Sequence, residues 1–471
     1  MNKKILNLAI PSIISNITVP LLGLVDTAIT GHMGEARYIG AIAVGSMIFN
    51  VTYWLFGFLR MGTGGLTAQA YGREDMQEAL TTGFRSLIIS SIIGTLIILF
   101  QMPLLSFALW FIAPEQGVMS LTRLYCDICI WGAPATLGLF ALNGWFVGMQ
   151  NTKIPMAISI SQNIINILLS LTFVYCYDMK IDGVALGTLI AQWAGFIIGL
   201  VSMLLMAWKT TVPISREDLF DHVALKHFFT VNRDIFIRTI FLVAVNLYFI
   251  AAGAKFGETI LAVNTLLMQL FTLYSFVMDG FAYAAEALCG RYYGARDNTS
   301  LNRAIRRIFL WSLGLTVIYT LVYVFGGSGF LTLLTDNTTV ITASSDYLPW
   351  AMLIPFAGIV AFVWDGVFIG MTLTRGMLLG TCVASGVFFV TYLSFASILG
   401  NHSLWLAFIL YLLFRGITQS VYYKTTRQAN NKPTRPKTPD SYQAHKENEY
   451  IGGDTTDEYS SAMHLQSHIP Q

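Results

Sequence analysis

Long apolar runs follow one another along most of the chain, separated by short polar breaks or by breaks that contain glycine and proline. A helix needs about 20 consecutive apolar residues to cross a bilayer, and these runs are long enough. The pattern therefore predicts twelve transmembrane helices. The first six are expected at residues 5–30, 38–65, 82–109, 121–148, 155–177 and 184–208. The second six are expected at residues 234–254, 259–288, 305–328, 344–371, 376–399 and 402–423.

The polar stretches divide the chain into four expected parts. Residues 1–208 form an amino-terminal six-helix lobe, 209–233 a cytoplasmic connector, and 234–424 a carboxy-terminal six-helix lobe. Residues 425–471 contain four prolines, clustered basic residues and no apolar run, which predicts a disordered cytoplasmic tail. Only 11% of the residues are charged, against about 25% in soluble domains. We therefore expect an all-α integral membrane protein.

Basic residues are concentrated in alternate connections, on the side of the amino terminus. These connections carry Lys3, Lys4, Arg73, Lys153, Lys209, Arg216, Lys226, Arg233, Arg291, Arg296, Arg303, Arg306, Arg307 and Arg375. The opposite connections carry little beyond Arg37, Lys180 and Lys255. By the positive-inside rule both termini are expected in the cytoplasm, as an even number of spans requires. Because the basic residues lie at helix ends, we expect no nucleic-acid partner.

The two halves of the chain are related by a constant offset of 222 residues. The segment GWFVGM at 144–149 falls on GVFIGM at 366–371, and Gly72 and Asp75 fall on Gly294 and Asp297. The offset predicts duplication of a six-helix unit. Because six is even, both units insert in the same direction and form a parallel repeat, which favours a carrier with its site between or within the lobes.

Asp26 is the first charge within the opening apolar run. A carboxylate inside a membrane costs about 2.5–3.5 kcal/mol on insertion scales, so it marks a candidate functional site. Pro11 and Pro20 interrupt the same helix, and each favours a kink. The alternative is a structural Asp26 whose polar neighbours, Thr27 and Thr30, satisfy it.

Four stretches carry a more specific resemblance. They are AIPSI…VDTAITGHMG within residues 9–34, GFLRMGTGGLTAQAYGRED at 57–75, NIINILLS…GVALGT within 163–188 and LAVN…DGFAYAAEALCGRYYGARD within 261–297. Across residues 1–424 the chain resembles the multidrug and toxic compound extrusion (MATE) antiporters, in particular their DNA-damage-inducible-F-like branch. The resemblance implies two lobes around a cleft that opens to alternate sides. It also implies a protein of the bacterial inner membrane that exports lipophilic, often cationic compounds. This export is coupled to entry of H⁺ or Na⁺.

The resemblance also assigns expected roles to residues. The coupling carboxylate of this branch corresponds to Asp26, and the proline that bends the first helix when this carboxylate changes state corresponds to Pro11. The amino-terminal cation site of the family also uses an Asn and, four residues later, an Asp on the fifth helix, with a Thr on the sixth. The ion-coupling residues expected here are therefore Asp26, Asn163, Asn166, Ser170 and Thr188.

Ser170 departs from the family pattern, because it replaces the second carboxylate. A hard cation prefers several oxygen ligands, whereas a proton needs one carboxylate that can titrate. We therefore expect H⁺ rather than Na⁺ as the coupling ion. The alternative is a weak Na⁺ site at Asp26, Asn166 and Thr188. We expect no other metal or cofactor.

Further polar residues fall within the predicted spans. Those that resemble parts of the cleft or of an interlobe network are Arg60, Asp279, Glu286 and Asp365. Arg60 should face the cleft or a carboxylate, because a lone arginine in a span is costly. Glu286 has an alternative partner in Arg291, near the cytoplasmic end of its helix. Cys126 and Cys129 form a CxxC motif without a second pair, which favours packing over a metal site.

The sequence fits two other functional classes less well than an efflux antiporter. A lipid-linked sugar flippase would need several basic residues in its cavity, and only Arg60 and Arg415 are predicted well inside the spans. An enzyme is not expected, because the chain lacks HExxH, GxSxG and P-loop motifs. The expected partners are small lipophilic or cationic compounds and membrane lipids, with the protein as a monomer.

Overall fold

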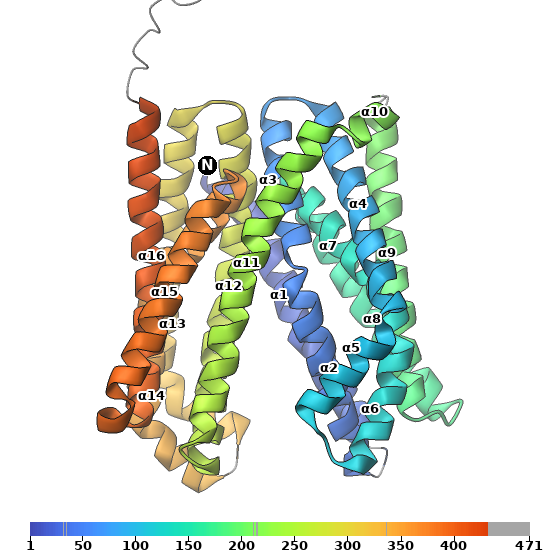
Figure 1. Ribbon diagram of the computed structural model, residues 1–471, viewed down its shortest axis with the longest axis vertical. Helices are drawn as coiled ribbons and strands as arrows, with labels where there is room; N and C mark the ends of the chain where they lie inside the picture. Colours follow the sequence, from blue (N-terminus) through green and yellow to red (C-terminus); the bar gives the residue numbers. More distant parts are fainter. Residues whose placement is uncertain (32, 34, 211, 213–214, 336, 432–471) are drawn as a thin grey trace, which may run out of the picture. The chain divides into compact units, whose positions relative to one another are not determined.

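The computed structural model describes residues 1–31, 33, 35–210, 212, 215–335 and 337–431, and this part of the chain is helical without strands (Figure 1). The chain divides into two units, Met1–Tyr423 and Lys424–Gln471. Most of the predicted disordered tail, residues 432–471, lies outside the described residues. The last helix continues to Asn431, so residues 425–431 of the predicted tail are helical.

The helices form in the order that the apolar pattern predicts. The first half contains α1 (Asn2–Gly31), α2 (Ala36–Leu55), α3 (Phe58–Gly72), α4 (Met76–Leu99), α5 (Gln101–Ile112), α6 (Gln116–Cys129), the 3₁₀ turn η1 (Ile130–Gly132), α7 (Ala133–Gly148), α8 (Lys153–Tyr175) and α9 (Ile181–Thr210). The second half contains α10 (Arg216–Leu219), α11 (His222–Ala254), α12 (Glu258–Gly294), α13 (Asn298–Leu334), α14 (Thr338–Gly370), α15 (Thr374–Leu399) and α16 (Asn401–Asn431).

Within the described residues, eleven helical segments are long and apolar enough to cross a membrane. The thirty-residue α1, which is the first predicted span, completes the twelve-helix layout. Both Pro11 and Pro20 lie inside α1, which is assigned as one uninterrupted helix.

Three predicted boundaries were wrong. The second span is broken at Phe56 and Gly57 into α2 and α3. The third was placed at 82–109, but α4 ends at Leu99 and a separate short helix, α5, follows. Pro103 is tolerated there because it lies in the first turn of α5, where its missing N–H would have no helical partner. The seventh span was placed at 234–254, but α11 begins at His222, within the expected connector 209–233.

Equivalent backbone positions confirm the repeat. A Cβ atom on Gly144 would collide with the backbone of Arg60, and one on Gly366 would collide with the backbone of Ala282, 222 residues further on. Asp75 and Asp297 cap the helices α4 and α13 in the same way, each accepting the N–H of the third residue after it. The sequence offset is therefore an offset in space as well.

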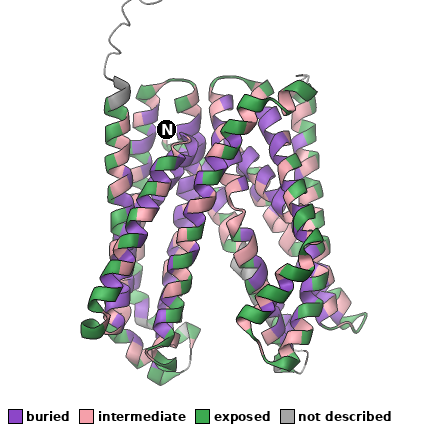
Figure 2. Ribbon diagram, viewed as in Figure 1, coloured by how far each residue is buried: buried purple, intermediate pink, exposed green. Residues whose placement is uncertain are grey.

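The two lobes meet along α3 and α12, where small residues allow close approach. A Cβ on Gly72 would collide with the Arg291 backbone, and one on Gly294 would collide with the Gln69 backbone. Hydrogen bonds cross the same interface, from Gln69 Nε2 to Gly370 O at 2.9 Å and from Gln150 Nε2 to Ala287 O at 2.7 Å. Buried residues therefore concentrate where the helices face one another, as Figure 2 shows.

The first turns of α1 pack with the opposite lobe. Ile5, Leu8 and Ala9 belong to the hydrophobic core of the carboxy-terminal lobe. Further along, Asn16 Nδ2 donates to Phe276 O on α12 at 3.0 Å. The α1 helix thus links the two lobes before it reaches Asp26.

Candidate functional site

Asp26 lies near the end of α1 and is buried, with 7% of its surface exposed. Its Oδ1 atom is inaccessible and has no hydrogen-bond partner among the described residues. Thr30 Oγ1 donates to the backbone carbonyl of Asp26 at 2.8 Å, not to the carboxylate. The side chain of Thr27 lies outside the described part of the structure. This Thr30 hydrogen bond thus goes to the backbone, and the part of the structural alternative that involves Thr27 lies outside the described residues.

The α1 and α8 helices run in parallel with a nearly constant register. Thr152 Oγ1 donates to Asn7 O at 3.3 Å, and Asn163 Nδ2 donates to Thr18 O at 2.9 Å, so the same sequence separation joins both pairs. Both helices rise 1.5 Å per residue. The register therefore places Asp26 at about the height of Ser170.

The other predicted coupling residues gather between α8 and α9. Asn166 Nδ2 donates to Thr188 Oγ1 at 2.9 Å, and Thr188 Oγ1 donates to Val184 O at 3.0 Å. Asn166 and Ser170 are fully buried, yet Asn166 Oδ1 and Ser170 Oγ have no hydrogen-bond partner in the described chain. Asn163 instead holds α8 to α1 through Thr18. The amino-terminal lobe thus holds several buried oxygens that have no hydrogen-bond partner among the described residues.

The α6 helix supplies two further neighbours of Asp26 that the motif reasoning did not include. Tyr125 and Cys129 both lie within electrostatic range of its carboxylate. Cys129 Sγ donates to Ala185 O at 3.7 Å, which joins α6 to α9 one turn before Thr188. No group of potential metal ligands occurs among the described residues, and Cys126 and Cys129 are buried packing residues there.

Arg60 on α3 forms an ion pair with Glu286 on α12, across the interface between the lobes. Arg60 Nη1 lies 3.1 Å from Glu286 Oε2, and its guanidinium lies over the Tyr283 ring at 4.2 Å. A Cβ on Gly64 would collide with Glu286 Oε1, so this glycine makes room for the carboxylate. The prediction that Arg60 faces a carboxylate is confirmed.

The alternative partner proposed for Glu286 was wrong. Arg291 lies over the Tyr71 ring, with its guanidinium carbon 5.3 Å from the ring centre. Glu286 is fully buried, so its charge needs a partner within the protein. Among the described residues, Arg60 is the only arginine that forms an ion pair with it.

Asp365 on α14 is held by three side chains of the carboxy-terminal lobe. Arg238 of α11 forms an ion pair with Asp365 Oδ2, and Arg415 Nη2 of α16 lies 3.0 Å from the same oxygen. Gln419 Nε2 donates to Asp365 Oδ1 at 2.7 Å. The arrangement is a buried charge network. Asp279 lies within electrostatic range of both arginines and of Arg60.

The family model MatE matches residues 11–172 and 235–393, which together are more than half of the chain. The chain is also 35% identical over 436 residues to DNA damage-inducible protein F of Escherichia coli, covering 90% of this chain and 92% of that protein. The chain belongs to the MatE family.

Two more distant proteins resemble the chain in sequence or in fold. A probable multidrug resistance protein NorM of Photorhabdus laumondii is 23% identical over 388 residues, covering 80% of this chain and 83% of that protein. A solved transporter of the MOP superfamily from Pyrococcus furiosus shares the fold, with a TM-score of 0.82, 19% identity, and coverage of 91% of this chain and 96% of that one. The protein is a multi-pass membrane transporter of the multidrug and toxic compound efflux family, not an enzyme.

Within this MatE protein, two buried arginines were missed by the sequence reasoning. Arg238 lies well inside α11, although α11 was predicted to begin only four residues earlier, at 234. Arg85 lies in α4 and donates to the backbone carbonyls of Asp218 and Leu219 at 2.7 and 3.1 Å. The prediction that only Arg60 and Arg415 lie well inside the spans was therefore wrong. The position of Arg238 four residues after Asp234 in an apolar run was the available signal.

Proposed function

We propose that this protein is an antiporter of the bacterial inner membrane, with both termini in the cytoplasm. It exports lipophilic, often cationic compounds in exchange for H⁺ by alternating access. Asp26 is the coupling carboxylate, and Asn163, Asn166, Ser170 and Thr188 form its polar surroundings. Pro11 is the point at which α1 bends.

The main support for this proposal is that the buried Asp26 carboxylate has no arginine or lysine partner among the described residues. Its Oδ1 is buried without a hydrogen-bond partner in the described residues, whereas Asp365 and Glu286 each have an arginine partner. A carboxylate that is not committed to a fixed cation is free to bind and release a proton during transport. Asp26 also lies on the helix whose first turns pack with the opposite lobe, so its charge is able to influence how the lobes meet.

The arrangement of the lobes supports alternating access. The interlobe contacts run from Arg60 and Glu286 to the ends of α3 and α12. At the opposite ends, Figure 1 shows the beginning of α2 and the end of α11 far apart. The positive-inside pattern assigns the contacting ends to the cytoplasm. The separated ends then lie on the outer side.

Na⁺ coupling is the second candidate. Asn166 Oδ1 and Ser170 Oγ are buried without hydrogen-bond partners among the described residues, and the register places Ser170 level with Asp26. Neutral oxygens beside one carboxylate suit a weakly bound Na⁺. The single carboxylate favours H⁺, because one negative charge is all that proton binding requires.

The lipid-linked sugar flippase gains no support from the buried arginines. Each arginine at the middle of the lobes has a carboxylate partner, Glu286 for Arg60 and Asp365 for Arg238 and Arg415. A pyrophosphate would have to compete with these carboxylates.

The proposal is tested in proteoliposomes with a lipophilic cationic dye. Dye movement is measured with a pH gradient at equal Na⁺, and separately with a Na⁺ gradient at equal pH. We expect the pH gradient alone to drive dye transport, and transport to dissipate that gradient. Transport driven only by the Na⁺ gradient would establish the second candidate, and transport by neither would contradict antiport.

A further inference from the structure

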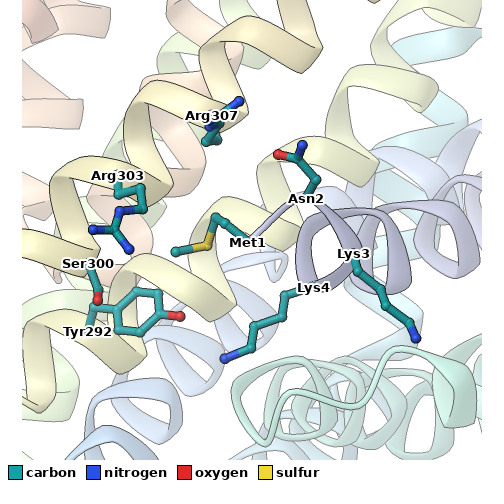
Figure 3. A pocket seen from close by; sticks show the side chains of 8 residues that line it. All are labelled: Met1, Asn2, Lys3, Lys4, Tyr292, Ser300, Arg303 and Arg307. Atoms are coloured by element: carbon teal, nitrogen blue, oxygen red, sulfur yellow. The ribbon is translucent and has the colours of Figure 1, made fainter.

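A cavity of about 680 Å³ lies where the start of α1 meets the end of α12 and the start of α13. This volume is within the range of about 300–1,000 Å³ typical of small-molecule sites. We call it the basic cleft. It is lined by Met1, Asn2, Lys3, Lys4, Tyr292, Ser300, Arg303 and Arg307 (Figure 3). Its walls therefore come from both lobes.

The lining of the basic cleft is strongly positive. It contains four basic side chains and no Asp or Glu, and none of the four forms an ion pair within the part of the chain that the structure describes. Asp297 lies within electrostatic range of Arg303. A hydrogen bond from the Ser300 side chain lowers the pKa of Asp297, and so does the Ser300 N–H, which its carboxylate accepts at 2.9 Å. One ionised carboxylate offsets only part of the positive charge.

The side chains approach the basic cleft from two sides. Figure 3 shows Arg303, Ser300 and Tyr292 on one side and Lys4 on the other, while Lys3 extends away. The hydroxyl group of Tyr292 adds a hydrogen-bond donor to the charged ones. Guanidinium, ammonium and hydroxyl donors in one cleft are the groups that bind a phosphate.

The face of α13 that carries the two arginines continues as an exposed apolar stripe. At helical spacing after Arg303 and Arg307 come Leu310, Trp311, Val317, Ile318 and Leu321. All five are exposed. A cationic cleft that leads directly into an apolar helix face matches an amphiphile, with its headgroup in the cleft and an acyl chain along the stripe.

We propose that the basic cleft binds a phosphate-bearing anion, and that this anion is the headgroup of an anionic membrane lipid. The apolar stripe of α13 selects the lipid over a free phosphate. Because α1 belongs to one lobe and α12 and α13 to the other, the bound headgroup screens the repulsion between Lys4 and Arg303. It thereby favours the arrangement in which the lobes meet at this end.

The test measures the melting temperature of the full chain in detergent. Short-chain phosphatidylglycerol is titrated, with phosphatidylcholine of the same chain length and inorganic phosphate as separate arms. We expect phosphatidylglycerol to raise the melting temperature in a saturable manner, and phosphatidylcholine to leave it unchanged. If inorganic phosphate raises the melting temperature saturably and by as much as phosphatidylglycerol does, the cleft binds a soluble anion. That result would overturn the proposal of a lipid headgroup.

Variants separate a site from general surface charge. Lys4→Ala and Arg303→Ala should each raise the phosphatidylglycerol concentration at half-effect about tenfold. Arg306→Ala removes the same charge from an exposed neighbour on α13 that does not line the cleft, and it should behave as the parent. Equal weakening by Arg306→Ala, or stabilisation by phosphatidylcholine equal to that by phosphatidylglycerol, would overturn the basic cleft as a site.

Discussion

The two lobes have equivalent helix packing but differ in where their buried charges lie. At repeat-equivalent positions, Asp26 corresponds to Tyr248, Asp365 to Asn143, and Arg238 to Asn16. The amino-terminal lobe has a carboxylate with an unpaired oxygen, whereas Asp365 in the carboxy-terminal lobe is held by two arginines and a glutamine. Duplication therefore preserved the helix packing and left the polar chemistry free to diverge.

The contrast explains how one lobe can respond to a proton while the other stays fixed. A carboxylate in an ion-pair network loses its partner interactions when it is protonated, which is costly in a buried site. A carboxylate without such partners pays no comparable penalty. The largest effects of substitution should therefore fall on transport in the first lobe and on stability in the second.

Asp26→Asn should give the largest effect on transport. The amide keeps the shape of the carboxylate and cannot titrate, so we expect gradient-driven dye efflux to fall more than tenfold while the melting temperature stays near that of the parent. Proteoliposome efflux and thermal unfolding measure the two outcomes. Asp127→Asn, at an exposed position on α6, is the control and should keep full activity. Parental efflux by the Asp26 variant would remove it from the coupling role.

Asp365→Asn should give the largest effect on stability. It leaves Arg238 and Arg415 buried without their carboxylate, and removing one partner of a buried ion pair costs about 3–5 kcal/mol. Thermal unfolding in detergent measures the loss. The exposed Asp346 lies on the same helix, and Asp346→Asn should change little. If both variants melt alike, the network is not what stabilises this lobe.

Glu286→Gln tests the junction between the lobes. The substitution removes the charge that Arg60 faces at 3.1 Å, and a hydrogen bond to a charged group contributes about 1.5–3 kcal/mol. We expect a stability loss of this size, together with faster hydrogen exchange at the α3–α12 interface. Glu258→Gln, at the exposed start of α12, should show neither change. Unchanged exchange in the Glu286 variant would show that the ion pair does not hold the lobes together.

Ser170→Asp should give the smallest effect and reveals how the first lobe selects its ion. Two carboxylates at the same height favour a cation between them. At Na⁺ about tenfold above its dissociation constant, the variant should gain about 1.4 kcal/mol of stability. Melting temperature in NaCl, compared with KCl at equal ionic strength, measures the gain. The parent and Ser170→Asn should not respond selectively to Na⁺, and a selective response of the parent would contradict proton coupling.

The sequence alone determined the membrane class, the twelve spans and the repeat, because these depend on local apolar patterning and on a constant spacing of glycines. It also made Asp26 a candidate, since a charge within an apolar run is visible without any tertiary information. Breaks inside apolar segments were less visible. The helix boundary at Phe100 is marked only by Gln101 and Pro103, between two long apolar stretches, and is therefore easily overlooked.

Only the tertiary structure decided which buried charges are paired. Arg60 and Glu286 lie 226 residues apart, and Arg238 and Asp365 lie 127 apart. Helical periodicity relates residues within a turn or two of each other and carries no information about such partners. The structure shows that Glu286 contacts Arg60 rather than the nearby Arg291, because Gly64 on the opposing helix leaves space for its carboxylate. A membrane interior cannot solvate a lone charge, so the presence of a partner matters. Long-range packing gives Asp365 its arginine partners and leaves Asp26 without one among the described residues.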